Sequence, residues 1–467
     1  MKNKTLLSLL SLLLIFVLVV STVSCVFINP EFTTTQSTKN EDNNISGPED
    51  ENREPIDYTS TFYLIDALFR NYSIFEIDYE KAMLAAIKAY VEITGDKYAM
   101  FYTPDELDEM QAENQGDLYG IGVQVIFDYK NYYMEVVLIM PDSPAESELK
   151  VGDLVTHIYV DGEKVALSDL VDEYKIRAKE LYPHYTEEEI NNVACYEAFQ
   201  YAITQIKGPI NTYAEFTVVR DGESYEYKIE RAQVKTVSVT SKVSIKDPTV
   251  GIVSISQFDM TTPVQFQQCM DALILSGCDK FVFDVRNNPG GDVASIVAVV
   301  STLLKEGDVI LSTKDHKGNE TITKVKDVNY SLQSGYSTCN VSKHDIGKYS
   351  GYKYAVLANE NSASAAELFT AVLRDYDIAE VIGTKTFGKG SMQSVIDLKQ
   401  YGPEYHGALK LTTRLYFPPC GIGYDGGIGI EPDYVVELEG IAAETNFFKL
   451  TEDIDNQLQK AVASLID

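Results

Sequence analysis

The residues best suited to chemistry lie in three short segments of the C-terminal half. The first segment, DVRNNPGG at residues 284–291, follows an apolar run and precedes a helical pattern. Glycines at such a junction let backbone N–H groups face a ligand, and a helix N-terminus favours negative charge. The segment therefore predicts an oxyanion or phosphate cradle, with a tight strand-to-helix turn as the alternative.

The second segment, NENSASAAE at residues 359–367, has the same placement between a strand and a helix. A serine at a helix start is most often an N-cap that binds the first turn. It becomes a nucleophile only beside a base that takes its proton. Ser364 is therefore a candidate nucleophile that needs a partner.

The third segment, GTKTFGKG at residues 383–390, nearly matches the phosphate loop GxxxxGK[ST]. Gly390 replaces the Ser or Thr that would hold Mg²⁺, and residues 392–398 alternate like a strand where that loop needs a helix. The pattern argues against nucleotide binding. It leaves Lys389 on a glycine turn within reach of Ser364, where burial would favour a neutral amine able to act as a base. A surface lysine is the alternative.

The ordered set NNPGG, NSASAAE and TFGKGSMQ resembles the C-terminal processing peptidases, also called tail-specific proteases. These are serine proteases with a Ser–Lys dyad and an inserted PDZ domain. The resemblance extends from about Tyr58 to the C-terminus. It includes GDKYAMFYTPDELDEM, YGIGVQV, MPDSPAESELKVGDLVTHIYVDGEKV and LKLTTRLYFPPCGIGYDGGIGIEPDYVVE.

The resemblance implies a role for each matching residue. Ser364 falls on the family's nucleophile, and Lys389 follows it at the family's spacing as the general base. Gln393 falls on the glutamine that orients the lysine. The backbone N–H groups of Gly291 and Ala365 fall on the oxyanion donors.

The chain around these segments predicts an α/β protein. Apolar residues recur at helical spacing over residues 59–94, short strands and turns follow over 120–232, and strands alternate with helices from Thr249 onward. Such alternation predicts a mixed, largely parallel α/β sheet. The resemblance adds a crotonase/ClpP-like protease core with N-terminal helices and an inserted, β-rich PDZ domain.

We therefore expect five regions along the chain. They are an export or lipoprotein signal at 1–25, a disordered acidic linker at 26–56, an N-terminal helical segment at 57–112, a PDZ domain at 113–233 with a helical insertion at about 167–192, and the Ser–Lys protease core at 234–467.

The predicted PDZ domain carries its own candidate site. Backbone N–H groups of Tyr119, Gly120, Ile121 and Gly122 could bind a chain-terminal carboxylate while an exposed strand edge pairs with the peptide. The alternative is a glycine turn in an ordinary small β-domain.

The first residues predict export. Lys2 and Lys4 precede an apolar run over residues 6–23, and Ser24-Cys25 resembles a bacterial lipoprotein cleavage site with Cys25 as the lipidated residue. The run is also long enough for an uncleaved membrane anchor, and plain secretion is a third possibility. We expect tethering on the outer face of the cytoplasmic membrane.

Composition excludes several functions. The 467 residues carry 39 Lys and Arg against 70 Asp and Glu, a formal net charge of −31, which argues against nucleic-acid partners. Five His without HExxH or CxxC argue against a catalytic zinc, so we expect neither metal nor cofactor.

The sequence thus predicts an exported serine endopeptidase that recognises the free C-termini of protein or peptide substrates. The alternative from another class is a catalytically silent PDZ lipoprotein that binds peptide C-termini as an adaptor. Cleavage of casein or of a tailed peptide would separate the two.

Overall fold

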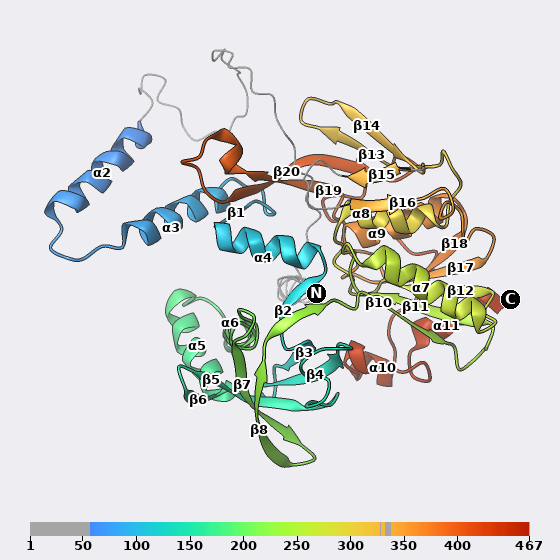
Figure 1. Cartoon of the computed structure of the whole chain (residues 1–467), viewed down its shortest axis with the longest axis horizontal. Coiled ribbons are helices and arrows are strands. Elements are labelled where there is room, and N and C mark those ends of the chain that lie inside the picture. The colour runs from blue at the N-terminus through green and yellow to red at the C-terminus, as the bar shows by residue number, and fades with distance from the viewer. Residues whose placement is uncertain (1–56, 327, 332–337, 467) are drawn as a thin grey trace.

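The computed structural model describes residues 57–326, 328–331 and 338–466 (Figure 1). The predicted signal, the acidic linker and Cys25 lie outside these residues. Within them, the chain forms a mixed α/β structure with three larger sheets, as the sequence predicted.

The central sheet is largely parallel. Strand β10 pairs antiparallel with β11, and the pairs that follow it in the order β10-β11-β12-β17-β18-β21 are parallel. The strands are β10 (Val239–Val243), β11 (Val250–Ile255), β12 (Lys280–Asp284), β17 (Lys353–Ala358), β18 (Ala379–Gly383) and β21 (Tyr434–Val435).

Helices cover both faces of this sheet. Side chains alternate across a strand, so Phe281 and Phe283 of β12 share a core with α7, α8 and α9, while Val282 packs with α11 on the other face. The helices are α7 (Thr262–Leu275), α8 (Val293–Ser301), α9 (Ala365–Asp375) and α11 (Asn456–Ile466).

A second, antiparallel sheet lies beside the parallel one. Its order is β1-β20-β13-β14, and β19 pairs with residues 408–415 of β20, which include the three residues that pair with β1. The strands are β1 (Met100–Tyr102), β13 (Val309–Asp315), β14 (Glu320–Lys324), β19 (Ser391–Asp397) and β20 (Ala408–Phe417). The sequence predicted the strand at 392–398, but it did not predict this sheet, whose β1 comes from the N-terminal region.

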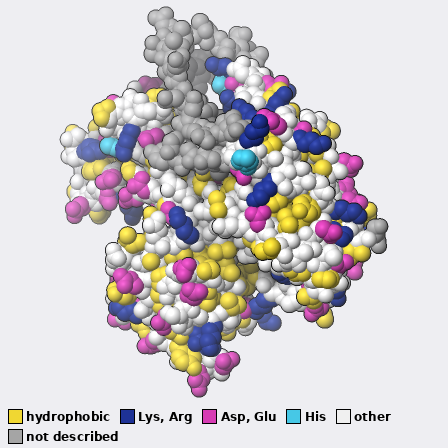
Figure 2. Space-filling model, turned by 45° about the vertical axis from the view of Figure 1, so that its right-hand side comes forward, with side chains coloured by type: hydrophobic (Ala, Val, Ile, Leu, Met, Phe, Trp, Pro, Cys, Tyr) yellow, Lys and Arg dark blue, Asp and Glu magenta, His cyan; other side chains and the backbone are white. Residues whose placement is uncertain are grey.

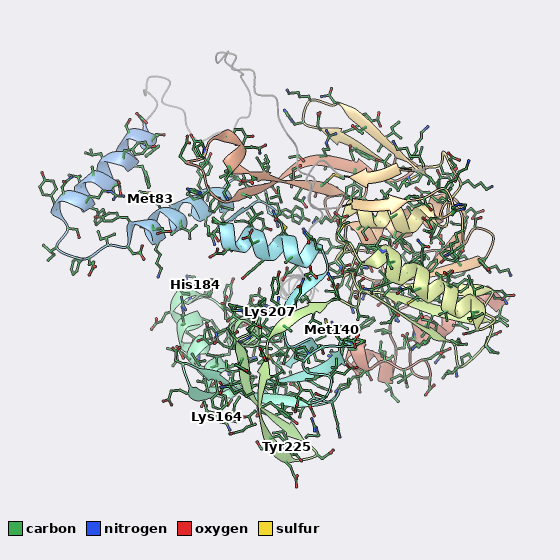
Figure 3. All side chains as sticks on the ribbon, in the orientation of Figure 1. Met83, Met140, Lys164, His184, Lys207 and Tyr225 are labelled. Carbon is green, nitrogen blue, oxygen red and sulfur yellow. The ribbon has the colours of Figure 1, made fainter. Side chains whose placement is uncertain are left out.

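The third sheet has its own apolar core and lies over residues 123–230. Its order is β3-β4-β5-β7-β8, with β6 paired to β5. The elements are β3 (Val123–Asp128), β4 (Tyr133–Ile139), β5 (Leu154–Val160), β6 (Glu163–Ala166), α5 (Leu167–Leu181), α6 (Glu187–Ile206), β7 (Tyr213–Arg220) and β8 (Glu223–Glu230). The helical segment thus extends beyond residue 192. Figure 3 labels Lys164, His184 and Tyr225 on this part of the chain.

An N-terminal arm projects from the body (Figure 1) and carries Met83, labelled in Figure 3. It consists of α2 (Tyr58–Tyr72) and α3 (Tyr79–Glu92), and α2 has no buried residue. The described helices include none with the length and apolar character needed to cross a membrane. The remaining elements are α4 (Pro104–Asn114), β2 (Asp117–Gly120), β9 (Ala232–Lys235), β15 (Val328–Ser331), β16 (Thr338–Val341), η1 (Leu398–Tyr401), α10 (Ile441–Glu444) and η2 (Phe447–Lys449).

A buried ionic cluster joins the end of β12 to α11. The Arg286 guanidinium donates to Asp284 at 2.7 Å, to Asp455 at 2.7 Å and to Gln457 at 2.9 Å. Arg286 is 5% exposed, so these bonds are shielded from water. The cluster fixes the strand end from which the DVRNNPGG loop departs. On the face of the molecule shown in Figure 2, acidic and basic side chains are interspersed.

Replacing Arg286 by Met should destabilise the fold by about 3–5 kcal/mol, because two buried carboxylates lose their shared cation. Lys280→Met, at the start of β12, is the matched control. It removes an ion pair with a largely exposed Asp279 and should cost less than about 1 kcal/mol. Urea unfolding measures both values. Equal costs for the two variants would contradict the role of the cluster.

Candidate active site

Ser364 stands at the turn between β17 and α9 in an unusual backbone conformation. Its φ is 55° and its ψ is −115°, a region that non-glycine residues occupy only when their surroundings hold them there. The preceding residue provides one such hold, since the Ala363 N–H donates to the Asn288 carbonyl at 2.9 Å. Ser364 is 8% exposed. The turn therefore leaves a small part of Ser364 accessible, while the residues on either side of it are buried.

The neighbouring Ser362 has a different role. Its hydroxyl donates to the Val285 carbonyl at 2.8 Å and accepts the Asn359 N–H at 2.9 Å. Ser362 is fully buried. These bonds hold the loop to the end of β12, so Ser362 is a structural serine.

A single carboxylate joins Ser364 to the loop of Lys389. Glu367 accepts the backbone N–H of Ser364 at 2.9 Å, of Lys389 at 2.8 Å and of Gly388 at 2.7 Å, and the Thr386 hydroxyl at 2.6 Å. The first two N–H groups bond to the same oxygen, Oε2. Burial raises the pKa of Glu367 to about 7, although these hydrogen bonds favour its ionised form. The carboxylate thus fixes the two backbone segments relative to each other.

Lys389 is a buried side chain with 3% exposure. Its ammonium nitrogen lies 4.4 Å from the centre of the Tyr98 ring. Its backbone carbonyl accepts the Tyr416 hydroxyl at 2.6 Å, and Tyr416 and Ser364 line one pocket. Burial raises the pKa of Tyr416 well above its ordinary value, so this phenol remains protonated. Glu367 therefore joins the lysine turn to the serine turn, and Tyr416 binds the lysine turn beside Ser364.

The glycines of the NNPGG loop pack directly on the serine turn. A Cβ on Gly290 would lie 2.7 Å from the Cβ of Ser364, and one on Gly291 would lie 2.0 Å from the Phe258 carbonyl oxygen. Both glycines have positive φ, at 108° and 138°. The close approach of this loop to its neighbours requires glycine at both positions.

Within the described residues, the backbone N–H groups of Gly291 and Ala365 donate to no protein acceptor.

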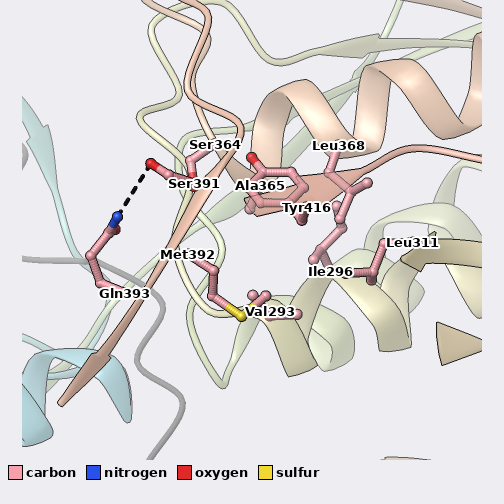
Figure 4. A pocket seen from close by; sticks show the side chains of 10 residues that line it. All are labelled: Val293, Ile296, Leu311, Ser364, Ala365, Leu368, Ser391, Met392, Gln393 and Tyr416. Atoms are coloured by element: carbon pink, nitrogen blue, oxygen red, sulfur yellow. Dashed lines mark hydrogen bonds between the residues drawn. The ribbon is translucent and has the colours of Figure 1, made fainter. Parts of the chain in front are cut away.

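Gln393 lies on β19 opposite Thr412 of β20, at a bulge between Met392 and Gln393. Its Nε2 donates to the Thr412 hydroxyl at 3.1 Å and to the Ser391 hydroxyl at 3.3 Å, the second bond being drawn in Figure 4. The side chain is buried. Its amide therefore has a fixed orientation.

An apolar pocket adjoins these groups (Figure 4). It is a small cavity of about 10 Å³, room for roughly one water molecule, and its lining includes both Ser364 and Gln393. Its other lining residues are Val293, Ile296, Leu311, Ala365, Leu368, Ser391, Met392 and Tyr416.

The predicted carboxylate-binding residues lie in another part of the molecule. Tyr119 and Gly120 belong to β2, and Ile121 packs in the core of the third sheet. Gly122 has a φ of 81°, and a Cβ there would lie 2.2 Å from the Ser143 Cβ. The segment is thus a tight turn that leads into β3.

Sequence reasoning missed three residues of the site: Glu367, Tyr98 and Tyr416. Glu367 had a usable signal, because a glutamate three residues after a helix-start serine is the pattern of a capping box. Tyr98 and Tyr416 had none, since their strands and loops meet the lysine only in three dimensions.

One protein-family model matches the part of the chain that carries these residues. Residues 249–436, which contain the serine turn, the lysine loop and the NNPGG loop, match the model described as peptidase family S41. The matched residues 249–436 are termed the S41 region. The antiparallel strand β1, the arm and the third sheet lie outside this S41 region.

Similar proteins extend beyond the S41 region. The chain is 27% identical over 385 residues to a Staphylococcus aureus protein named "Probable CtpA-like serine protease", covering 81% of this chain and 66% of that protein. A protein of the same name from Staphylococcus epidermidis is 26% identical and is covered to 60% of its length. The chain thus spans just under two thirds of these curated relatives.

Among solved structures, the chain is similar to a photosystem II D1 C-terminal processing protease. The TM-score is 0.43 at 21% identity, and the match covers 81% of this chain and 87% of that one.

The pKa of Glu367 predicts a pH dependence of stability. The folded chain holds the proton up to about pH 7, while the unfolded chain releases it near the ordinary value of 4.5. Between these values the native state binds more protons, so the free energy of unfolding falls as pH rises, by up to about 1.4 kcal/mol per pH unit. Urea unfolding at several pH values should show this decline, and Glu367→Gln should flatten it.

Glu360→Gln is the matched control. Glu360 also accepts a threonine hydroxyl, that of Thr384 at 2.8 Å, but it is exposed. The control should keep the slope of the parent chain. An unchanged slope in Glu367→Gln would show that Glu367 does not titrate in this window.

Proposed function

We propose that this chain is a serine endopeptidase with Ser364 as nucleophile and Lys389 as general base. The observation that carries the proposal is the Glu367 carboxylate, which binds the backbone N–H groups of both residues through one oxygen. Because both backbones bond to one oxygen, the two residues lie side by side, as proton transfer between a hydroxyl and an amine requires. The match of residues 249–436 to the peptidase family S41 model supports the same assignment.

The reaction follows from the groups present. Ser364 Oγ attacks the carbonyl carbon of the scissile bond as its proton passes to the neutral amine of Lys389. The N–H groups of Gly291 and Ala365 stabilise the resulting oxyanion. The Lys389 ammonium then returns the proton to the leaving amine as the C–N bond breaks. Water, deprotonated by the same amine, hydrolyses the acyl-enzyme and frees Ser364.

Gln393 positions the base in this scheme. The burial of Lys389 supports its role, because an amine accepts a proton only in the neutral form and removal from water favours that form. Gln393 is buried in the same site and lines the pocket beside Ser364. Held by Thr412 and Ser391, it offers its other amide atom to the lysine.

Substrate recognition is proposed to use the C-terminal tail of the substrate. The turn at Gly120–Gly122 leads into β3, which ends the strand order of the third sheet and so has one edge without a partner strand in that sheet. An extended peptide can add to such an edge while its carboxylate meets backbone N–H groups. We further propose export and tethering to the membrane through Cys25 or the N-terminal apolar run, on the sequence alone.

Ser364→Ala and Lys389→Ala should each abolish cleavage of a tailed peptide while leaving the unfolding transition in place. Because the two act as one unit, the double variant should be scarcely slower than either single variant. Lys389→Arg should also fail, since guanidinium does not deprotonate in the working range. Steady-state kinetics measure all four.

Lys385→Ala is the matched control for the lysine. It lies on the same loop but is exposed and pairs with the exposed Glu431 at 3.2 Å. It should keep the parent kcat. Full proteolysis by purified Ser364→Ala would overturn the mechanism.

Amidation of the C-terminus of a good peptide substrate should raise KM markedly, because the amide cannot offer the anion that backbone N–H groups bind. The acid and amide forms of one peptide provide the comparison in a peptide-cleavage assay. Equal rates for the two forms would contradict carboxylate recognition by residues 119–122.

A further inference from the structure

A short segment outside the S41 region contacts both groups that surround the lysine. Asp96, between α3 and β1, accepts the Thr412 N–H at 2.7 Å, the Thr412 hydroxyl at 3.0 Å and the Tyr98 N–H at 3.0 Å. Thr412 is the partner of Gln393, and Tyr98 is the ring beside the Lys389 nitrogen. The Asp96 carboxylate therefore binds both the partner of Gln393 and the residue whose ring lies beside Lys389.

The donors and acceptors leave a single arrangement of these groups. A threonine hydroxyl has one proton, and here that proton goes to Asp96, because an ionised carboxylate can only accept. The Thr412 oxygen can then only accept from Gln393. Nε2 must face Thr412, and the carbonyl oxygen Oε1 must face the opposite side of the amide.

Orientation of this amide matters for the lysine. A lysine amine and a lysine ammonium both present N–H donors, so a glutamine can hold either one through Oε1 but not through Nε2. A reversed amide would place its N–H groups against those of Lys389. Orientation of the glutamine is thus a condition for holding the base.

The Tyr98 ring completes the arrangement. Its N–H donates to the same Asp96 carboxylate, which closes a short turn that also includes the bond from the Ala99 N–H to the Asp96 carbonyl at 2.9 Å. The turn sets the ring 4.4 Å from the Lys389 nitrogen. The Tyr98 hydroxyl is buried and has no hydrogen-bond partner in the described residues, so the ring is what this residue contributes.

We propose that Asp96 is a positioning residue for the catalytic base, acting through Thr412 on Gln393 and through Tyr98 on Lys389. This inference rests on the proposed function of Lys389 and Gln393. The simpler role for Asp96 is a staple that holds β1 against β20, since Met100 pairs with Lys410 immediately beyond it. A staple would affect stability without acting through Gln393.

The test uses the whole chain with substitutions on this relay. Asp96→Asn and Thr412→Val should lower kcat roughly tenfold with little change in KM, the scale of losing part of a general base's alignment. Thr412→Ser restores the hydroxyl and should recover the parent kcat. Asp78→Asn removes a carboxylate that accepts the Lys81 N–H at the start of α3 and should leave kcat unchanged.

The deciding measurement is a double-mutant cycle with Gln393→Ala. If Asp96 acts through Gln393, adding Asp96→Asn to Gln393→Ala should lower kcat by a clearly smaller factor than Asp96→Asn does in the parent, because only the route through Tyr98 remains. The acylation burst with an activated p-nitrophenyl ester provides a second readout at Ser364 that does not need the natural substrate. Thermal unfolding checks that each variant is folded.

The outcomes separate the two proposals. An equal loss of kcat from Asp96→Asn in both backgrounds would overturn the relay and leave the Ser–Lys mechanism in place. If Asp96→Asn does not fold, Thr412→Val decides, because it keeps the backbone bond to Asp96, and a parent-like kcat there would overturn the relay. A parent chain with neither cleavage nor burst would overturn the proposed function, and this inference with it.

Discussion

The site depends on one buried carboxylate. Glu367 takes hydrogen bonds from two segments that the chain delivers separately, the start of α9 and the loop before β19. Burying a carboxylate is unfavourable, and its raised pKa reflects that cost. Four donors offset it. The same bonds help to hold Ser364 at a positive φ, so the backbone conformation of the serine and the position of the lysine loop have a common cause.

Asp96 has an equivalent place on the other side of the lysine. Glu367 fixes the backbone of Lys389, and Asp96 binds the residues next to its side chain. Each carboxylate joins segments distant in sequence, and each accepts three or more hydrogen bonds. A lysine amine on a flexible stem has many rotamers, and loss of that freedom opposes its placement. Supports at both ends of the side chain reduce what remains to be ordered when a substrate binds.

Local sequence patterns predicted much of the fold, but they did not predict pairing between segments that are distant in sequence. The strands and helices from Thr249 onward could be predicted because a parallel sheet covered on both faces leaves long apolar runs and regular alternation. The antiparallel sheet escaped because β1 pairs with β20, about three hundred residues later, and three residues give no period. The Ser364 and Lys389 positions came from a resemblance. The role of Asp96 could not be predicted. Two of its three bonds come from backbone N–H groups, which nearly every residue type has, so the identity of the donor residues gives no signal.

Features that destabilise the fold distinguish an enzyme from a silent peptide-binding adaptor. A binding module needs only the third sheet, which has a separate core and its own free edge. The serine turn, the buried lysine and the buried Glu367 each carry a free-energy cost and contribute nothing to that edge. They lie together in the S41 region, beside a small apolar cavity. Unfavourable features gathered at one place, each held by its neighbours, favour catalysis as the reason for the arrangement.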